Sequence, residues 1–288
     1  MTDLLQHVAN GVVQGLFIGM AALAITLVFG IARFPNAATG DMMTFGAYAG
    51  LVAQQAANSL VLAGAVAILA GAVVALASHW LVFRRLAGRS VVSLLVASIG
   101  VAFMIRAVLG VVFGQAQAVF QVPLTRAQLY WGVRVTPLNL QISQVVVAAL
   151  LVVFAVLYFT PIGRQMRAVA DDRDLARVSG IRPERVMVAL WLMAGAVAGL
   201  AGMMLGIKTV VAPEVGWEML LPAFTAAILG GIGSAPGAVL AGLLLGVAQE
   251  VSTPFVGFSY KIAIAFLVML GVLLVRPSGL FGRSESVR

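Results

Sequence analysis

Cysteine is absent from the sequence, and histidine is nearly so, because His7 and His79 are the only two. The lack of cysteine excludes disulfide bonds and thiolate metal sites, and two distant histidines leave little material for a metal centre. Lysine is equally rare: Lys208 and Lys261 are the only two, and neither follows the glycine of a GxxxxGK[ST] loop. We therefore expect no metal, no cofactor and no ATP-hydrolysing site in this chain.

The sequence also lacks the side-chain sets that membrane hydrolases use. It contains no HExxH segment, and Asp41 is the only acid between Asp3 and Asp171. Ser234 has no histidine in a nearby segment, so a serine–histidine arrangement is not expected either. The chain is therefore not predicted to be an enzyme.

Charge of either sign is scarce. Only 10% of the 288 residues are charged, 62% are hydrophobic, and the mean hydropathy is +1.07. A soluble domain carries about 25% charged residues, so this chain is expected to use the lipid bilayer as its solvent. The net charge of +8 is spread between apolar blocks, which fits basic cytoplasmic loops better than nucleic-acid binding.

Long apolar runs predict an all-α polytopic membrane protein with eight to ten transmembrane or half-membrane helices, at about 20 residues per span. The amino-terminal run has no basic residue before Arg33, so we expect a retained span and not a signal peptide. Residues 114–141, with Trp131 as an aromatic anchor, are expected to form an interfacial loop. The expected spans are 4–32, two within 42–83 with a turn at Asn58–Ser59, 91–113, 142–159, 186–207, two within 219–249 broken by GGIGSAPG, and 262–275.

The positions of Lys and Arg predict how the chain is oriented. Cytoplasmic loops of membrane proteins carry an excess of basic residues. With the N-terminus outside and the C-terminus in the cytoplasm, thirteen of the 18 basic residues lie inside. The inverted topology would place the basic loops outside, so we reject it.

One cytoplasmic stretch, RQMRAVADDRDLARVSGIRPER at 164–185, holds ten of the 28 charged residues. It has no glycine or proline before Gly180, which predicts a short helix over roughly 164–179 with a small apolar edge at Leu175, Val178 and Ile181. Arginines alone would set the topology, but four acids would not help. A docking surface for a soluble partner therefore explains the composition better than a solvated loop does.

Four segments, in order, resemble one family. They are PNAATGDMMTFGAYAG (35–50), GRQMRAVADDRDLARVSGI (163–181), AILGGIGSAPGAVLAGLLLGVAQE (227–250) and RPSGLFG (276–282). Together they resemble the permeases of bacterial ABC importers of the branched-chain amino acid type, and most of all the shorter of the two permease types. The resemblance covers nearly the whole chain, so residues 1–288 are expected to form a single transmembrane permease domain.

The resemblance implies the partners and the mechanism. Two cytoplasmic ATPase subunits would bind ATP and Mg²⁺ and press on a coupling helix at about 164–180. A second permease subunit, non-identical or a second copy of this chain, and an extracytoplasmic solute-binding protein would complete an alternating-access importer in the bacterial inner membrane. The residues expected at the ATPase contact are Arg167, Ala170, Asp171, Asp172, Leu175, Val178 and Gly180.

The segment RFPNAATGD is the first candidate for the substrate pathway. Proline and turn-forming residues interrupt the helix there, and transporters use broken helices to bind polar substrates near the membrane midplane. The alternative is a plain cytoplasmic turn with Asp41 as the N-cap of the next helix. The resemblance favours a pathway role for Asn36 and Thr39, with Asp41 and Tyr48 nearby.

The glycine-rich segment is the second candidate. Gly230, Gly231 and Gly233 could leave the amides at a half-helix N-terminus open to a substrate carboxylate. Tight helix packing through small residues is the commoner explanation of such a segment.

The candidate pathway departs from the pattern of the family at three positions. Ala37 and Thr39 stand where an aromatic residue and then His or Gln are common, and Pro35 replaces an aliphatic residue. The solute is therefore open between a branched-chain or other hydrophobic amino acid and a related amide or organic acid.

Arg106 lies within a predicted span, about 22 Å along its helix, and we expect it to snorkel to the outer surface. The same is expected of Glu250. The remaining alternative to an ABC permease is a standalone secondary carrier or channel, which would not need the charged cytoplasmic helix.

Overall fold

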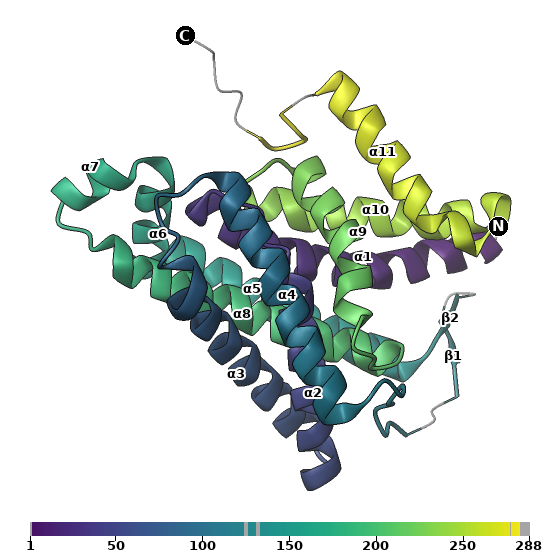
Figure 1. The fold of residues 1–288 in the computed structure, drawn as a ribbon. Helices are drawn as coiled ribbons and strands as arrows, with labels where there is room; N and C mark the ends of the chain where they lie inside the picture. The colour runs from purple at the N-terminus through teal and green to yellow at the C-terminus, as the bar shows by residue number, and fades with distance from the viewer. Residues whose placement is uncertain (1, 124–125, 131–132, 277, 283–288) are drawn as a thin grey trace.

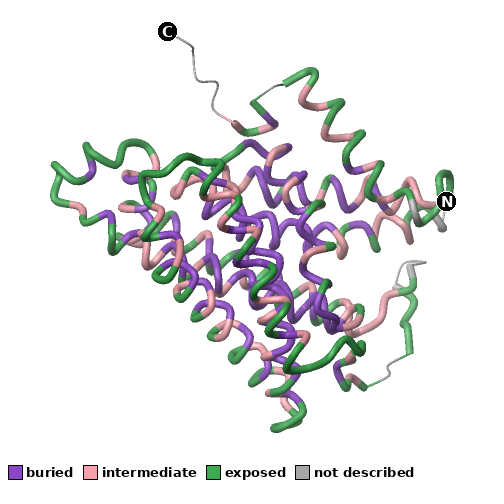
Figure 2. The backbone as a smooth tube through the Cα atoms, viewed as in Figure 1, coloured by how far each residue is buried: buried purple, intermediate pink, exposed green. Residues whose placement is uncertain are grey.

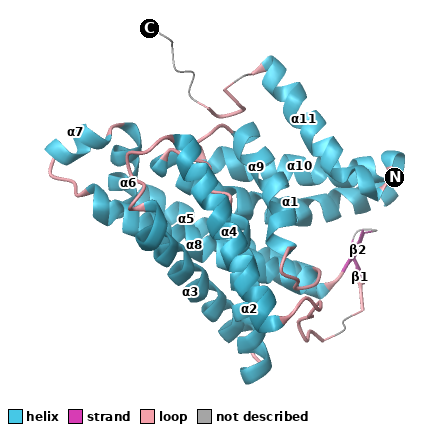
Figure 3. Cartoon of the chain, in the orientation of Figure 1, coloured by secondary structure: helices cyan, strands magenta, loops and turns pink. Residues whose placement is uncertain are grey.

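The computed structural model is a helical bundle with one short hairpin, and it describes residues 2–123, 126–130, 133–276 and 278–282 (Figure 1, Figure 3). Six helices are long and apolar enough to cross a membrane. They are α1 (Thr2–Ala32), α3 (Leu60–Ser78) with its π-helical extension η1 (His79–Phe83), α4 (Val91–Phe113), α5 (Pro137–Phe159), α8 (Pro183–Lys208) and α10 (Ala235–Val256). The other long helices are α2 (Ala38–Ala57), α9 (Val215–Gly230) and α11 (Lys261–Val275).

The 114–141 region is a loop, as predicted, with a small hairpin in it. Strands β1 (Gln128–Tyr130) and β2 (Val133–Val135) pair antiparallel, and Ala118 forms an isolated bridge with Val211 beyond α8. Helix α5 begins at Pro137, earlier than the expected start at 142, because proline is well suited to the first helical turn. The expected anchor Trp131 lies outside the described residues.

Helix α1 runs through the middle of the bundle. Its most apolar window is 78% buried, whereas that of α4 is 22% buried. Figure 2 shows the same arrangement, with buried backbone concentrated in the centre and exposed backbone on the outer helices. The exposed side chains of α3, α4 and α5 are mostly apolar, so these helices can face lipid or another membrane subunit.

Glycines let α1 and α10 approach at backbone contact. A Cβ placed on Gly15 would lie 2.6 Å from the Cα of Leu243, and one on Gly246 would lie 2.2 Å from the amide nitrogen of Gly15. Small residues at regular spacing are the usual means of close helix packing in membranes. We call this α1–α10 contact, which also includes Gly11, Gly19 and Gly242, the glycine seam.

Several predicted boundaries are confirmed. Asn58 adopts the left-handed conformation at the end of α2, and the Ser59 hydroxyl accepts the amide of Leu62 at the start of α3. Helix α4 spans the predicted 91–113. The GGIGSAPG segment separates α9 from α10, with Ser234 as the N-cap of α10.

The single helix predicted over 164–179 is wrong, because the segment forms two helices, α6 (Pro161–Asp171) and α7 (Arg173–Val178). The first begins early because Thr160 caps it and Pro161 suits its first turn. Asp172 is extended and its Oδ1 accepts the amides of Asp174 and Leu175, so it starts a new helix. The predicted stop at Gly180 is confirmed, since this residue has φ +83° and closes a Schellman motif.

Helices α2 and α9 begin inside the bundle. Asp41, in the first turn of α2, contacts a residue that lies about 22 Å along α4 at 1.5 Å per residue. The amide of Gly216 at the start of α9 donates to the hydroxyl of Thr44 at 3.1 Å. The start of α9 therefore meets the first two turns of α2 away from the ends of the long spans, an arrangement that resembles discontinuous transporter helices.

Candidate functional site

The junction between α1 and α2 is a short non-helical segment held by polar contacts. Asn36 is fully buried, and its Oδ1 accepts the amide of Ala38 at 3.1 Å. The amide of Ala37 donates to the Ser98 hydroxyl on α4 at 3.0 Å. Pro35 has no amide to satisfy, which makes it compatible with this break. The junction is therefore held by a hydrogen bond to Ser98 of α4 and by a hydrogen bond to its own Asn36 side chain.

Asp41 and Arg106 form a two-pronged ion pair across α2 and α4. The Nε of Arg106 donates to Oδ1 of Asp41 at 3.0 Å, and Nη2 donates to Oδ2 at 3.1 Å. The rings of Trp217 and Phe103 lie 4.7 and 5.4 Å from the guanidinium. Breaking a buried ion pair by removing one partner costs about 3–5 kcal/mol, so this pair fixes α2 against α4.

Two expectations about this pair are corrected. Arg106 does not snorkel to the surface, because its guanidinium is paired with the carboxylate of Asp41 on the neighbouring helix α2. Asp41 is not the N-cap of α2, since Ala37 occupies that position and the Asp41 carboxylate is directed to Arg106. A depth estimate along one helix could not have revealed a partner that another helix supplies.

The contact between α2 and α4 continues one heptad further. Tyr48 lies seven residues after Asp41, Phe113 lies seven after Arg106, and their rings stack at 4.6 Å between centroids. Residues seven apart share a face of a helix, so the two helices pack in parallel register. Helix α4 therefore supports α2 along its length.

Three buried polar atoms on this segment have no hydrogen-bond partner among the described residues. They are Nδ2 of Asn36, Oγ1 of Thr39 and the hydroxyl of Tyr48. Buried polar groups are nearly always paired, and exceptions call for an explanation such as a ligand or water. These orphan groups are the feature expected of a polar pathway, and the pathway assignment of Asn36, Thr39, Asp41 and Tyr48 stays a prediction.

The glycine-rich segment has a packing role. A Cβ on Gly230 would lie 2.3 Å from the backbone of Gly237, and one on Gly231 would lie 2.3 Å from the amide nitrogen of Gly282. The amide of Phe281 donates to the carbonyl of Gly230, so residues 280–282 of the carboxyl-terminal motif pack on this segment. Gly233 lines a cavity of about 810 Å³ whose lining includes neither Asn36 nor Thr39. A substrate role for the three glycines stays a prediction.

The segment formed by α6 and α7 is anchored at one end and exposed at the other. Met166 and Val169 are buried, and Arg167 donates to the carbonyl of Leu157 and lies over the ring of Tyr158. Figure 1 shows α7 projecting from the bundle beyond α6. Helix α7 is therefore the part of the segment that is most exposed to a partner.

Two of the three residues predicted to form the apolar edge of this segment are exposed, whereas Ile181 is partly buried and packs against the core. Leu175 is 65% exposed and Val178 is 86% exposed, while Ala176 is buried toward the bundle. The amides of Leu175 and Asp174 hold the pKa of Asp172 below its ordinary value, because they donate to its carboxylate. Gly180 is exposed, and Ala170 and Asp171 line the cavity beside α6. The expected coupling residues thus share one end of the molecule.

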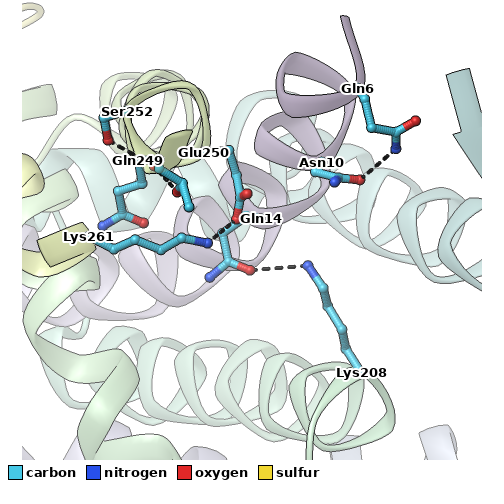
Figure 4. Close-up of polar contacts among 9 residues, drawn as sticks. Gln6, Asn10, Gln14, Lys208, Gln249, Glu250, Ser252 and Lys261 are labelled. Carbon is cyan, nitrogen blue, oxygen red and sulfur yellow. Dashed lines mark hydrogen bonds and ion pairs between the residues drawn. The ribbon is translucent and has the colours of Figure 1, made fainter. Parts of the chain in front are cut away.

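At another place in the bundle, both lysines of the chain join a polar cluster that sequence reasoning missed (Figure 4). Lys208 donates to Oε1 of Gln14 at 3.1 Å, and Lys261 pairs with Glu250. The expectation that Glu250 snorkels is therefore wrong. The only sequence signal for this cluster is that both lysines lie at ends of apolar runs. Within the described ranges, no group of three possible metal-binding side chains occurs.

These features define a class of protein: a multi-pass helical membrane protein with helices that begin inside the bundle and an exposed, highly charged segment at one end. The family model described as "Branched-chain amino acid transport system / permease component" matches residues 7–273. The chain therefore belongs to this family of ABC-importer permeases, which are transport subunits and not enzymes, as its four motifs predicted.

Individual relatives cover nearly the whole chain. The permease LivH of Salmonella typhimurium is 31% identical, over 98% of this chain and 96% of its own length. The permease BraD of Pseudomonas aeruginosa is 30% identical over the same shares of both chains. LivM of Salmonella typhimurium, also a permease of a high-affinity branched-chain amino acid system, is 32% identical over 52% of this chain and 37% of its own length.

Proposed function

We propose that this permease moves a small polar or amphipathic solute across the bacterial inner membrane by alternating access, driven by two separate cytoplasmic ATPase subunits that bind ATP and Mg²⁺. The solute is a branched-chain or other hydrophobic amino acid, or a related amide or organic acid. LivH and BraD are named for branched-chain amino acid transport, which favours the first group. Pro35, Ala37 and Thr39 depart from the pattern of the family, so a related amide or organic acid stays an alternative solute.

The proposal includes a second permease subunit and an extracytoplasmic solute-binding protein. The partial match to LivM, a differently named permease of such a system, favours a non-identical partner, with a second copy of this chain as the alternative. The large apolar surface of α3, α4 and α5 offers room for that partner. The proposed orientation has the N-terminus outside and the C-terminus in the cytoplasm, as the basic loops indicate.

The observation that carries the coupling role is the exposed apolar edge of α7 on an otherwise charged segment. Burying one such side chain against an ATPase contributes about 1.5–3 kcal/mol, whereas an exposed ion pair contributes about 0–1 kcal/mol. The charges around the edge would orient the partner and exclude wrong ones more than add affinity. Leu175 and Val178 should therefore matter more to binding than any single charged residue of the segment.

The test is Leu175→Asp in the complete importer, purified and placed in lipid vesicles. We expect the ATPase subunits to dissociate, or ATP hydrolysis to continue without uptake, because a charge replaces the buried contact. Co-purification of the ATPases and uptake per ATP are measured together. Arg177→Ala, a change to a neighbouring charged residue of α7, is the control and should have the smaller effect. Wild-type coupling in Leu175→Asp would instead favour a standalone carrier or channel.

A further inference from the structure

Arg33 has an unusual backbone conformation at the end of α1. Its φ is +59°, in the left-handed region, and its amide donates to the carbonyl of Phe29 at 3.0 Å. A helix that ends this way usually has glycine at that position, because a side chain strains the left-handed conformation. An arginine in this strained conformation points to a use for its side chain.

The side chain of Arg33 holds the end of α6. Its Nη2 donates to the carbonyl of Ala170 at 2.9 Å and to that of Asp171 at 3.2 Å. The last carbonyls of a helix have no partner within the helix, and the C-terminal end of the dipole attracts a cation. The amide of Asp172 satisfies the Ala168 carbonyl, and Arg33 satisfies the last two carbonyls of the helix. We call this contact the Arg33 clasp.

The clasp stands between two cavities on the same end of the molecule. One has a volume of about 810 Å³ and the other about 840 Å³, and both are lined by Arg33 and Asp171. Open space therefore lies on two sides of the place where Arg33 meets the end of α6. The Arg33 clasp is therefore flanked by cavities and not surrounded by packed side chains on every side.

Arg33 also lies at the start of the α1–α2 junction. Phe34 packs its ring 5.2 Å from that of Phe83 and 6.4 Å from that of Trp191, between centroids. Asn36, with its orphan amide nitrogen, follows two residues later. A displacement of the end of α6 would therefore reach the buried polar segment through only three residues of chain.

We propose that Arg33 is the positioning residue that transmits movement of the α6–α7 segment to the α1–α2 junction. This rests on the proposed function, since α6 and α7 must receive the movement of an ATPase. When the segment shifts, the clasp pulls on residue 33 and changes the position of Asn36 and the first turn of α2. The guanidinium is suited to this because it binds two carbonyls at once, which a lysine ammonium does with less fixed geometry.

The test compares Arg33→Gly, Arg33→Lys and wild type in the complete importer in lipid vesicles. Glycine accepts the left-handed backbone, so Arg33→Gly removes the clasp while it preserves the end of α1. We expect the ATPases to remain bound and ATP hydrolysis to continue, with uptake per ATP lowered about tenfold, within the range of measured coupling between sites. Arg33→Lys should give an intermediate value, since it keeps a cation at the end of α6.

Two outcomes would overturn the proposal. Wild-type uptake per ATP in Arg33→Gly would show that the side chain transmits nothing. Loss of the ATPases from Arg33→Gly would show that it holds the assembly together instead. Leu175→Asp, measured in the same preparation, tests the docking role of α7 separately. If that variant keeps its ATPases and its coupling, the proposed coupling role fails, whatever the Arg33 variants do.

Discussion

At the scale of single residues, the α1–α2 junction concentrates polar groups where a membrane protein can least accommodate them. Asp41 is satisfied by Arg106, but Asn36 and Thr39 each keep a buried atom without a partner in the described part of the chain. A transport pathway offers an explanation, because a passing solute or water would satisfy these atoms for part of the cycle. An unpaired buried polar atom destabilises the folded protein, but it can bind a solute that passes through the membrane.

Thr39→Val tests this role because valine has nearly the shape of threonine and lacks the hydroxyl. The folded protein loses no hydrogen bond, so its thermal stability should stay the same or rise. Uptake should fall by about two- to tenfold if the hydroxyl meets the solute, which corresponds to one hydrogen bond of about 0.5–1.5 kcal/mol. Uptake is measured in vesicles and stability by thermal aggregation of the purified complex.

The matched control for that variant is Thr26→Val. Thr26 on α1 is also buried, and its Oγ1 also has no partner among the described residues. It lies outside the α1–α2 junction, so its replacement should leave uptake unchanged. Equal effects of both variants, or none from either, would contradict a special role for Thr39.

The sequence predicted the break at Pro35, but it predicted neither the burial of Asp41 nor its partner. Proline and turn formers are local signals, and they can be read from neighbouring residues. The pairing of Asp41 with Arg106 depends on which face of α4 meets α2, and the nearly uniform apolar composition of α4 does not encode a face. Pairings between helices were therefore beyond sequence reasoning, whereas a break marked by proline and turn-forming residues was not.

At the scale of elements, the division of the charged segment into α6 and α7 changes what its acids do. Asp172 was expected to contact the ATPase, and the structure makes it the N-cap of the helix that presents Leu175. Ala, Arg, Met and Leu favour a continuous helix, so local propensity predicted no break. Helix α6 contacts α5 through Arg167 and Tyr158, and Arg33 binds its last turn, directly before the break. Local sequence patterns do not reveal these contacts between distant residues.

Asp172→Ala should fray α7 and weaken the binding of the ATPases, whereas Asp172→Asn should keep both, because asparagine caps helices as well as aspartate does. The amides lower the pKa of Asp172 below 3.8, so the charged cap is present above that value and is lost as the pH falls through the lowered pKa. Hydrogen exchange of the 173–178 amides at neutral pH measures the fraying. Equal protection in wild type and Asp172→Ala would contradict the capping role.

At the scale of the whole molecule, the arrangement of the helices is compatible with the proposed orientation. The basic loops, the α6–α7 segment and Arg33 gather at one end, as Arg33 and Arg84 contribute to cavities that contain Asp171. Gln6 contacts the backbone of Arg134, so the start of α1 meets the β1–β2 hairpin. The loops rich in arginine and the α6–α7 segment therefore lie at one end of the bundle, and the start of α1 lies with the β1–β2 hairpin.

The absence of cysteine makes this orientation easy to test, because any introduced cysteine is unique. Ser179→Cys, beside α7, should react with a membrane-impermeant maleimide only after the cells are opened. Gln128→Cys, on β1, should react in intact spheroplasts, and both residues are exposed in the structure. Reaction of Ser179→Cys in intact spheroplasts would reverse the topology and remove the basis for docking at α7.

The glycine seam has a consequence for how the protein is made. Helix α1 leaves the ribosome long before α10, the partner that fits its glycines, because more than 200 residues separate their starts. Until then the glycine face of α1 has no complementary surface, and lipid cannot approach a backbone as closely as another glycine can. The bundle can therefore close only when the two ends of the chain meet. Nascent chains that stop before α10 should depend on membrane chaperones and be cleared by proteolysis, even though most of their spans are complete.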